Sequence, residues 1–155
     1  MTENFQDYKE PNMFIGTISC CGKCCTEQGI PFGVCQNDPW RAQSFKHYED
    51  SEIIEKYLAD PISKAVVFGG LEPFEQFDEV YDFIRCLRVN YGNFDPVIIY
   101  TGYYENEILS SVELLKQFKN IVVKYGRFLI GHEKHFDDVL GVYLASPNQY
   151  AVKIS

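Results

Sequence analysis

The chain has 155 residues, of which 46% are hydrophobic and 15% aromatic, and its formal net charge at pH 7 is −8. This composition predicts one folded domain over residues 1–155 with a sizeable core. The acidic balance argues against a nucleic-acid partner, and no apolar run is long enough to predict a membrane span. We interpret the polar segment 1–12 as an N-terminal tail without a signal peptide, and we therefore expect a cytoplasmic protein.

Apolar runs and helical periodicities alternate along the rest of the chain. A first strand is predicted at 13–19, and a cysteine-rich loop follows it directly. A helix is predicted to begin at Asp50 or Ser51, either of which can cap it. The remaining expected elements are a strand at 64–70, a helix at 75–89, a strand at 96–103, a helix at 105–118, and strands at 120–126 and 137–146.

This alternation predicts an α/β fold of parallel strands joined by right-handed crossovers. With about five βα units the chain is too short for a closed eight-unit barrel, which leaves a partial, open (βα) barrel or a flat doubly wound sheet. In both folds, ligands bind in the loops that follow the strands. Three unusual loops fall there: the cysteine loop, "GGLEPF" at 69–74 and "TGYY" at 101–104.

Five of the six cysteines lie between residues 17 and 40, at Cys20, Cys21, Cys24, Cys25 and Cys35. A disulfide is disfavoured in a reducing compartment. Structural zinc usually takes two CxxC pairs, and only Cys21 and Cys24 form one, although Cys25 and Cys35 can complete four ligands. A redox pair at Cys21 and Cys24 leaves the other cysteines unexplained. A [4Fe–4S] cluster held by three cysteines leaves one iron open for a substrate or cofactor.

The cysteine loop resembles that of the radical S-adenosylmethionine enzymes, and in particular that of the activating proteins of anaerobic ribonucleoside-triphosphate reductase. The resemblance begins with Cys20-x3-Cys24, Cys35-Gln36-Asn37 and Trp40. It continues in the family's order through "VVFGGLEPF", "IIYTGYYENEI", "VVKYGRF" and "LASPNQ", over nearly the whole chain. The spacing departs from the family's CxxxCxxC pattern, because ten residues separate Cys24 from Cys35 and Glu27 stands where the third cysteine falls.

The resemblance implies a radical S-adenosylmethionine type of open barrel and an iron–sulfur oxidoreductase. The [4Fe–4S] cluster would be held by Cys20, Cys24 and Cys35, with Cys25 as a further candidate. Cleavage of S-adenosylmethionine would give a 5′-deoxyadenosyl radical that generates a glycyl radical on a partner reductase. The enzyme would also need a one-electron donor.

Residues around the second cofactor, S-adenosylmethionine, follow from the same motifs. Gly69 and Gly70 would let a ligand approach the backbone closely, and Glu72 would meet the methionine ammonium. The other expected contacts are Asn37 near the cluster, Tyr100 along the nucleoside, and Asn148. Two alternatives stay open: radical chemistry on a small molecule, and a non-catalytic protein that binds an iron–sulfur cluster or zinc.

Overall fold

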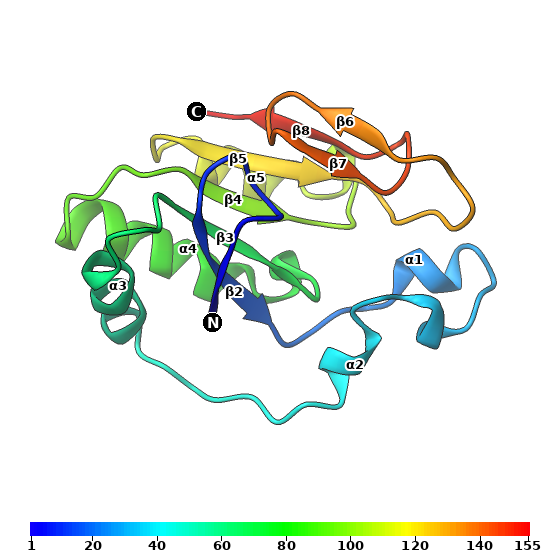
Figure 1. Ribbon diagram of the computed structural model, residues 1–155, viewed down its shortest axis with the longest axis horizontal. Helices are drawn as coiled ribbons and strands as arrows, with labels where there is room; N and C mark the ends of the chain where they lie inside the picture. The colour runs from blue at the N-terminus through cyan, green and yellow to red at the C-terminus, as the bar shows by residue number, and fades with distance from the viewer.

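The computed structural model describes residues 1–155, apart from the side chains of residues 3 and 4. Its main sheet has six strands in the order β1-β2-β3-β4-β5-β8, and β6 and β7 form a separate hairpin (Figure 1). The strands are β1 (Thr2–Asn4), β2 (Asn12–Thr17), β3 (Ala65–Gly70), β4 (Val97–Tyr100), β5 (Ile121–Tyr125), β6 (His135–Asp137), β7 (Val142–Leu144) and β8 (Tyr150–Lys153).

Three longer helices connect the central strands, and shorter helical turns lie in the loops. The helices are α1 (Lys23–Thr26), α2 (Asp38–Arg41), α3 (Asp50–Ala59), α4 (Phe77–Arg85) and α5 (Leu109–Leu115). The 3-10 turns are η1 (Phe32–Val34), η2 (Pro73–Gln76) and η4 (Glu105–Glu107), and the π-helical turn η3 (Cys86–Asn90) extends α4.

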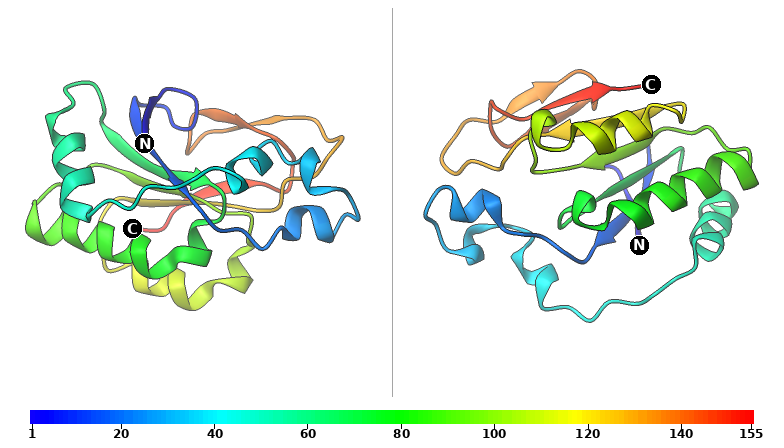
Figure 2. Two further views of the ribbon diagram at one scale, coloured as in Figure 1. Left: turned by 90° about the horizontal axis from the view of Figure 1, so that it is seen from below. Right: turned by 180° about the vertical axis from the view of Figure 1, so that it is seen from behind.

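The four strands β2 to β5 are parallel and lie side by side in chain order. Their connecting helices α3, α4 and α5 lie on one face of the sheet (Figure 2). Right-handed crossovers repeated in one direction produce this arrangement, because each return places its helix on the same side. The outer strands β1 and β8 pair antiparallel with β2 and β5. The protein is thus a mixed α/β protein with an open sheet, and its description as a partial barrel stays a prediction.

Both faces of the sheet are buried, which explains why the central strands are apolar throughout. On the helical face, Val66 and Ile99 pack with helix residues such as Ile84 and Leu115. On the opposite face, a second apolar cluster is formed by Tyr8, Ala65, Val67, Ile98, Val122, Leu140, Leu144 and Ala151. The polar segment 1–12 therefore contributes strand β1 and a buried tyrosine, where the sequence suggested a tail.

The predicted strand over 137–146 is wrong, because a turn divides it into β6 and β7. The Asp137 carboxylate accepts a hydrogen bond from the Leu140 N–H at 2.9 Å, and Gly141 adopts a positive φ of 72°. The chain reverses there and forms a hairpin, and the unpredicted strand β8 closes the sheet. In place of about five βα units, the four parallel strands are joined by three helical crossovers.

Trp40, which is the only tryptophan, packs on the glycines at the ends of β2 and β3. Gly70 has a φ of +83°, and a Cβ there would lie 2.5 Å from the Trp40 ring. We expect Gly70→Ala to lower the free energy of unfolding by about 1–2 kcal/mol, because alanine is strained in this conformation. We also expect the substitution to change the Trp40 fluorescence, because the ring must move.

Gly92→Ala is the matched control for this prediction. Gly92 also has a positive φ, 61°, but a Cβ there would meet nothing within 4 Å. Denaturant unfolding followed by tryptophan fluorescence should show a stability loss in both variants and an altered native spectrum only in Gly70→Ala. An unchanged native spectrum in Gly70→Ala would contradict the packing of Trp40 on this glycine.

Candidate functional site

The parallel strands end at the edge of the sheet that faces α1 (Figure 1). Residues that follow these strands line a pocket there. The cysteine loop after β2, the turn after β3, the loop after β4 and the segment after β5 all contribute to it. The pocket is small and open to solvent, and its lining residues are Cys20, Cys21, Lys23, Cys24, Glu72, Gly102, Tyr103 and Arg127. The three loops that the sequence singled out therefore meet at one site.

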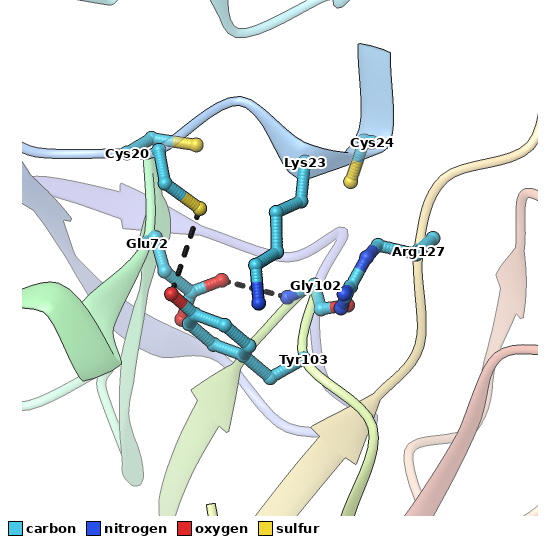
Figure 3. Close-up of a pocket in the computed structure, with 8 residues that line it drawn as sticks. Cys20, Lys23, Cys24, Glu72, Gly102, Tyr103 and Arg127 are labelled. Carbon is cyan, nitrogen blue, oxygen red and sulfur yellow. Dashed lines mark hydrogen bonds between the residues drawn. The ribbon is translucent and has the colours of Figure 1, made fainter. Parts of the chain in front are cut away.

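Three thiols of the cysteine loop line this pocket. Cys20 and Cys24 are half-buried, and their side chains lie above Glu72 and Gly102 (Figure 3). Cys21 is exposed, and its Sγ lies 3.5 Å from the Tyr103 hydroxyl. Burial raises the pKa of the Cys20 and Cys24 thiols. Both are therefore mainly protonated at neutral pH in the metal-free protein, and binding a metal would release their protons.

Glu72 is the buried carboxylate of the pocket. Its oxygens accept hydrogen bonds from the Thr101 hydroxyl at 2.7 Å and from the Gly102 and Phe74 N–H groups at 2.8 and 3.1 Å. Burial raises the pKa of Glu72, although these hydrogen bonds oppose the shift. A carboxylate with this burial is stabilised by a nearby cation.

Gly102 separates the carboxylate from a thiol. A Cβ at this position would lie 3.2 Å from the Cys24 Sγ and 3.5 Å from the Glu72 Oε2, so any larger residue would fill the space between them. Lys124 is buried nearby and donates to the carbonyls of Thr101 and Gly126. Burial lowers the pKa of Lys124 to about 8, while Cys24 and Glu72 favour its charged form.

Cys25 and Cys35 lie together, away from the pocket lining. Cys25 is only 2% exposed, and the Cys35 N–H donates a hydrogen bond to the Phe32 carbonyl at 2.9 Å. Burial raises the pKa of the Cys25 thiol. Of the predicted cluster ligands, the structure thus brings Cys20 and Cys24 together and separates Cys35 from them.

The two glycines expected to admit a ligand are covered by aromatic rings. A Cβ at Gly69 would lie 3.1 Å from the Phe14 ring, and the space at Gly70 is taken by Trp40. Neither glycine lines the pocket. Aromatic rings therefore cover the Cβ side of both glycines in this conformation, and the expected close approach of a ligand to their backbone stays a prediction.

Tyr100, Asn37 and Asn148 also lie outside the pocket lining. The Tyr100 hydroxyl donates to the Asp7 carbonyl at 2.6 Å, on the face opposite the helices. Asn37 precedes α2 and makes no side-chain capping bond. The Asn148 amide donates to the Tyr104 hydroxyl and the Arg127 carbonyl, and its buried Oδ1 has no hydrogen-bond partner among the side chains that the structure describes. Of the six expected cofactor contacts, only Glu72 lines the pocket.

Sequence reasoning missed Lys23, Gly102 and Arg127 as pocket residues. Gly102 and Tyr103 lie in the "TGYY" loop, whose position after a strand was a usable signal. Arg127 gave no local signal, because its partners Glu27 and Glu107 are distant in sequence.

The donor chemistry of the pocket fits an iron–sulfur cluster, since iron in such clusters is bound by cysteine thiolates. Lysine and arginine side chains lie around the thiols, and they suit the negative charge of a thiolate-bound cluster. Among the side chains that the structure describes, no group of three cysteine, histidine, aspartate or glutamate residues is gathered closely enough to hold a single metal ion.

The fold and the thiol-lined pocket together define an α/β protein with a candidate cluster site at the ends of its parallel strands. A family model described as a 4Fe-4S single cluster domain matches residues 14–141. The chain belongs to this family and is an iron–sulfur protein. No curated protein and no solved structure matches the chain. Within the described part of the chain, no helix has the length and apolar character needed to cross a membrane.

Proposed function

We propose that the protein is a radical S-adenosylmethionine activase that generates a glycyl radical on a partner anaerobic ribonucleoside-triphosphate reductase. The observation that carries this proposal is the pocket itself, in which cysteine thiols meet a buried carboxylate at the ends of parallel strands. Membership of the 4Fe-4S single cluster family supports it. When bound, the cluster supplies the electron that cleaves the sulfonium of S-adenosylmethionine.

Cys20 and Cys24 would hold the cluster together with a third thiolate from the same loop. Cys35 is the third ligand implied by sequence resemblance, while Cys21 is the third thiol at the pocket. Thiolate coordination would hold the cluster next to Glu72 and Gly102, which line the same pocket. Loop residues 25–35 would have to fold over the pocket for Cys35 to join the set.

Glu72 would bind the ammonium group of the methionine part of S-adenosylmethionine. Its carboxylate is held in place by three hydrogen-bond donors, so it is already oriented before a ligand arrives. Burial raises its pKa, and a bound ammonium would offset that desolvation. Binding of the ammonium group would explain why a carboxylate is buried in this pocket.

The open sheet is compatible with a macromolecular substrate. Its parallel strands follow in chain order with the helices on one face, as in a partial (βα) barrel, and the sheet does not close on itself. A glycine-bearing loop of a partner protein can enter such a site from the side. The one-electron donor would be a separate protein or a chemical reductant.

Anaerobic spectroscopy tests this function. The protein is reconstituted with iron and sulfide and reduced, and EPR spectra are recorded with and without S-adenosylmethionine. The expected result is a reduced [4Fe–4S] signal that changes on addition of S-adenosylmethionine, together with release of 5′-deoxyadenosine. Transfer of the radical is tested by adding an anaerobic ribonucleotide reductase and looking for a glycyl radical doublet. A cluster that ignores S-adenosylmethionine contradicts the proposal.

A non-catalytic cluster-binding protein is the second candidate. The specific observation in its favour is the separation of Cys35 from Cys20 and Cys24. For a non-catalytic protein we expect a stable cluster that releases no 5′-deoxyadenosine from S-adenosylmethionine under reducing conditions. Radical chemistry on a small molecule would instead give 5′-deoxyadenosine that depends on an added substrate and not on a protein partner.

A further inference from the structure

A chain of ion pairs joins the cysteine loop to the ends of the central strands. Arg127, just after β5, forms salt bridges with Glu27 at 3.0 Å and with Glu107 at 2.7 Å, and Lys23 pairs with Glu107 at 3.0 Å. Both carboxylates meet the guanidinium through two oxygens. We call Arg127, Glu27, Glu107 and Lys23 the Arg127 clamp.

Arg127 is the centre of this clamp, and each of its three guanidinium nitrogens donates at least one hydrogen bond. Its side chain is only 3% exposed, and it also donates to the Gly102 carbonyl at the pocket floor. The guanidinium lies 5.0 Å from the centroid of the Tyr104 ring and 5.5 Å from that of Tyr103. Paired two-point bonds between guanidinium and carboxylate fix direction as well as distance. The clamp therefore constrains where the attached segments lie.

The segment that needs such support is α1, which carries Cys24. It has four residues, and a helix of that length is not stable alone in water. Its attachments to the rest of the protein include Lys23 and Glu27 of the clamp and the neighbouring Gln28. The Gln28 amide donates to the Phe128 carbonyl at 2.8 Å and accepts from the Ile130 N–H at 3.1 Å.

We propose that Glu27 and Arg127 are positioning residues that hold α1, and with it the Cys24 thiol, on the pocket. Neither side chain acts as a ligand in this role. Their ion pair crosses from the cysteine loop to the strand ends, and it ties together segments that are 100 residues apart in sequence. Loss of the clamp frees α1 while the core of the sheet stays intact.

Hydrogen exchange in the metal-free protein tests the clamp directly. Glu27→Gln keeps the shape of the side chain but removes its charge, and Glu27 is half-exposed, so this variant is expected to fold. We expect amide exchange within residues 23–30 to become about tenfold faster or more, as for loss of a charged hydrogen bond. Exchange in β3 and β4 should be unchanged.

Two further variants sharpen the test. Arg127→Lys keeps the charge but cannot make two paired bonds at once, so it should loosen 23–30 as well. Glu113→Gln is the matched control, because Glu113 forms an exposed ion pair with Lys116 on α5, away from the clamp. It should leave exchange in 23–30 at the wild-type rate. Unchanged exchange in both Glu27→Gln and Arg127→Lys would overturn the proposal.

A second readout connects the clamp to the cluster and rests on the proposed cluster site. In reconstituted protein, Glu27→Gln should lose iron to a chelator about tenfold faster than wild type, which is the size of effect seen when residues that orient metal ligands are removed. Equal rates of iron loss in the two proteins would overturn the proposal that the clamp positions the Cys24 thiol. If the wild-type protein formed no cluster, the proposed function would fail. The hydrogen-exchange measurement would still show whether Glu27 and Arg127 hold α1 in place.

Discussion

Replacing Cys24 by alanine is expected to abolish stable binding of the iron–sulfur cluster. Cys24 lines the pocket together with Cys20, and its Sγ lies directly over Gly102 and near the buried Lys124. In the proposed site Cys24 is a ligand, so its removal would leave one iron without a bond to the protein. Iron and sulfide retained after anaerobic reconstitution and desalting should fall by about tenfold or more, since even the loss of residues outside the ligand shell can have effects of that size.

Cys86→Ala is the matched control for this prediction, because Cys86 lies in η3 and packs against the helical core. It should retain the wild-type iron content. Cys21→Ala and Cys35→Ala then identify the third ligand. Loss of iron in Cys21→Ala means that the pocket binds the cluster with its present lining, whereas loss in Cys35→Ala means that loop 25–35 closes over it. Wild-type iron content in Cys24→Ala would contradict the site.

The second large effect is expected for Glu72→Ala, which removes the acceptor at the centre of the pocket. Three donors, the Thr101 hydroxyl and the Phe74 and Gly102 N–H groups, lose their partner. An unsatisfied buried donor costs about 1–3 kcal/mol, and loss of the desolvated carboxylate offsets part of this. We expect the free energy of unfolding to fall by about 2–4 kcal/mol, as measured by urea denaturation of the metal-free protein.

Two further variants separate the hydrogen bonds from other effects of the substitution. Glu72→Gln keeps one accepting oxygen but turns an NH₂ group toward the remaining donors, so its stability should lie between those of wild type and Glu72→Ala. Glu79→Ala, at an exposed position of α4, should stay within about 0.5 kcal/mol of wild type. A stability loss in Glu72→Ala no larger than that of Glu79→Ala would show that the three donors do not depend on this carboxylate.

Local patterns along the chain predicted most of the parallel sheet. The runs around Val66, Ile98 and Val122 are apolar on both faces of the strand, and strands β3, β4 and β5 occur there. The helical periodicity of Val80, Ile84 and Leu87 likewise corresponds to buried positions of α4 and η3. These elements were predictable because a helix buried on one side has apolar residues at helical spacing, and a strand buried on both faces is a continuous apolar run.

The C-terminal region was not predictable in the same way. Residues 137–146 read as an apolar run, but the Asp137 carboxylate and Gly141 build a turn within it. The same carboxylate also accepts from the Ala151 N–H at 2.9 Å and ties the hairpin to β8. That contact joins residues 14 positions apart, so no short window of sequence could reveal it.

By itself, the sequence determined that thiols gather after the first parallel strand and that "GGLEPF" and "TGYY" follow the next two. These are consequences of chain order, because the ends of parallel strands meet at one edge of the sheet. Only the tertiary structure decided which thiols share a pocket. Successive residues of a helix point about 100° apart, and so Cys24 lines the pocket while Cys25 is buried beside Cys35. The tertiary structure also brought Arg127 to Glu27, because attraction between charges depends on their distance in space and not along the chain.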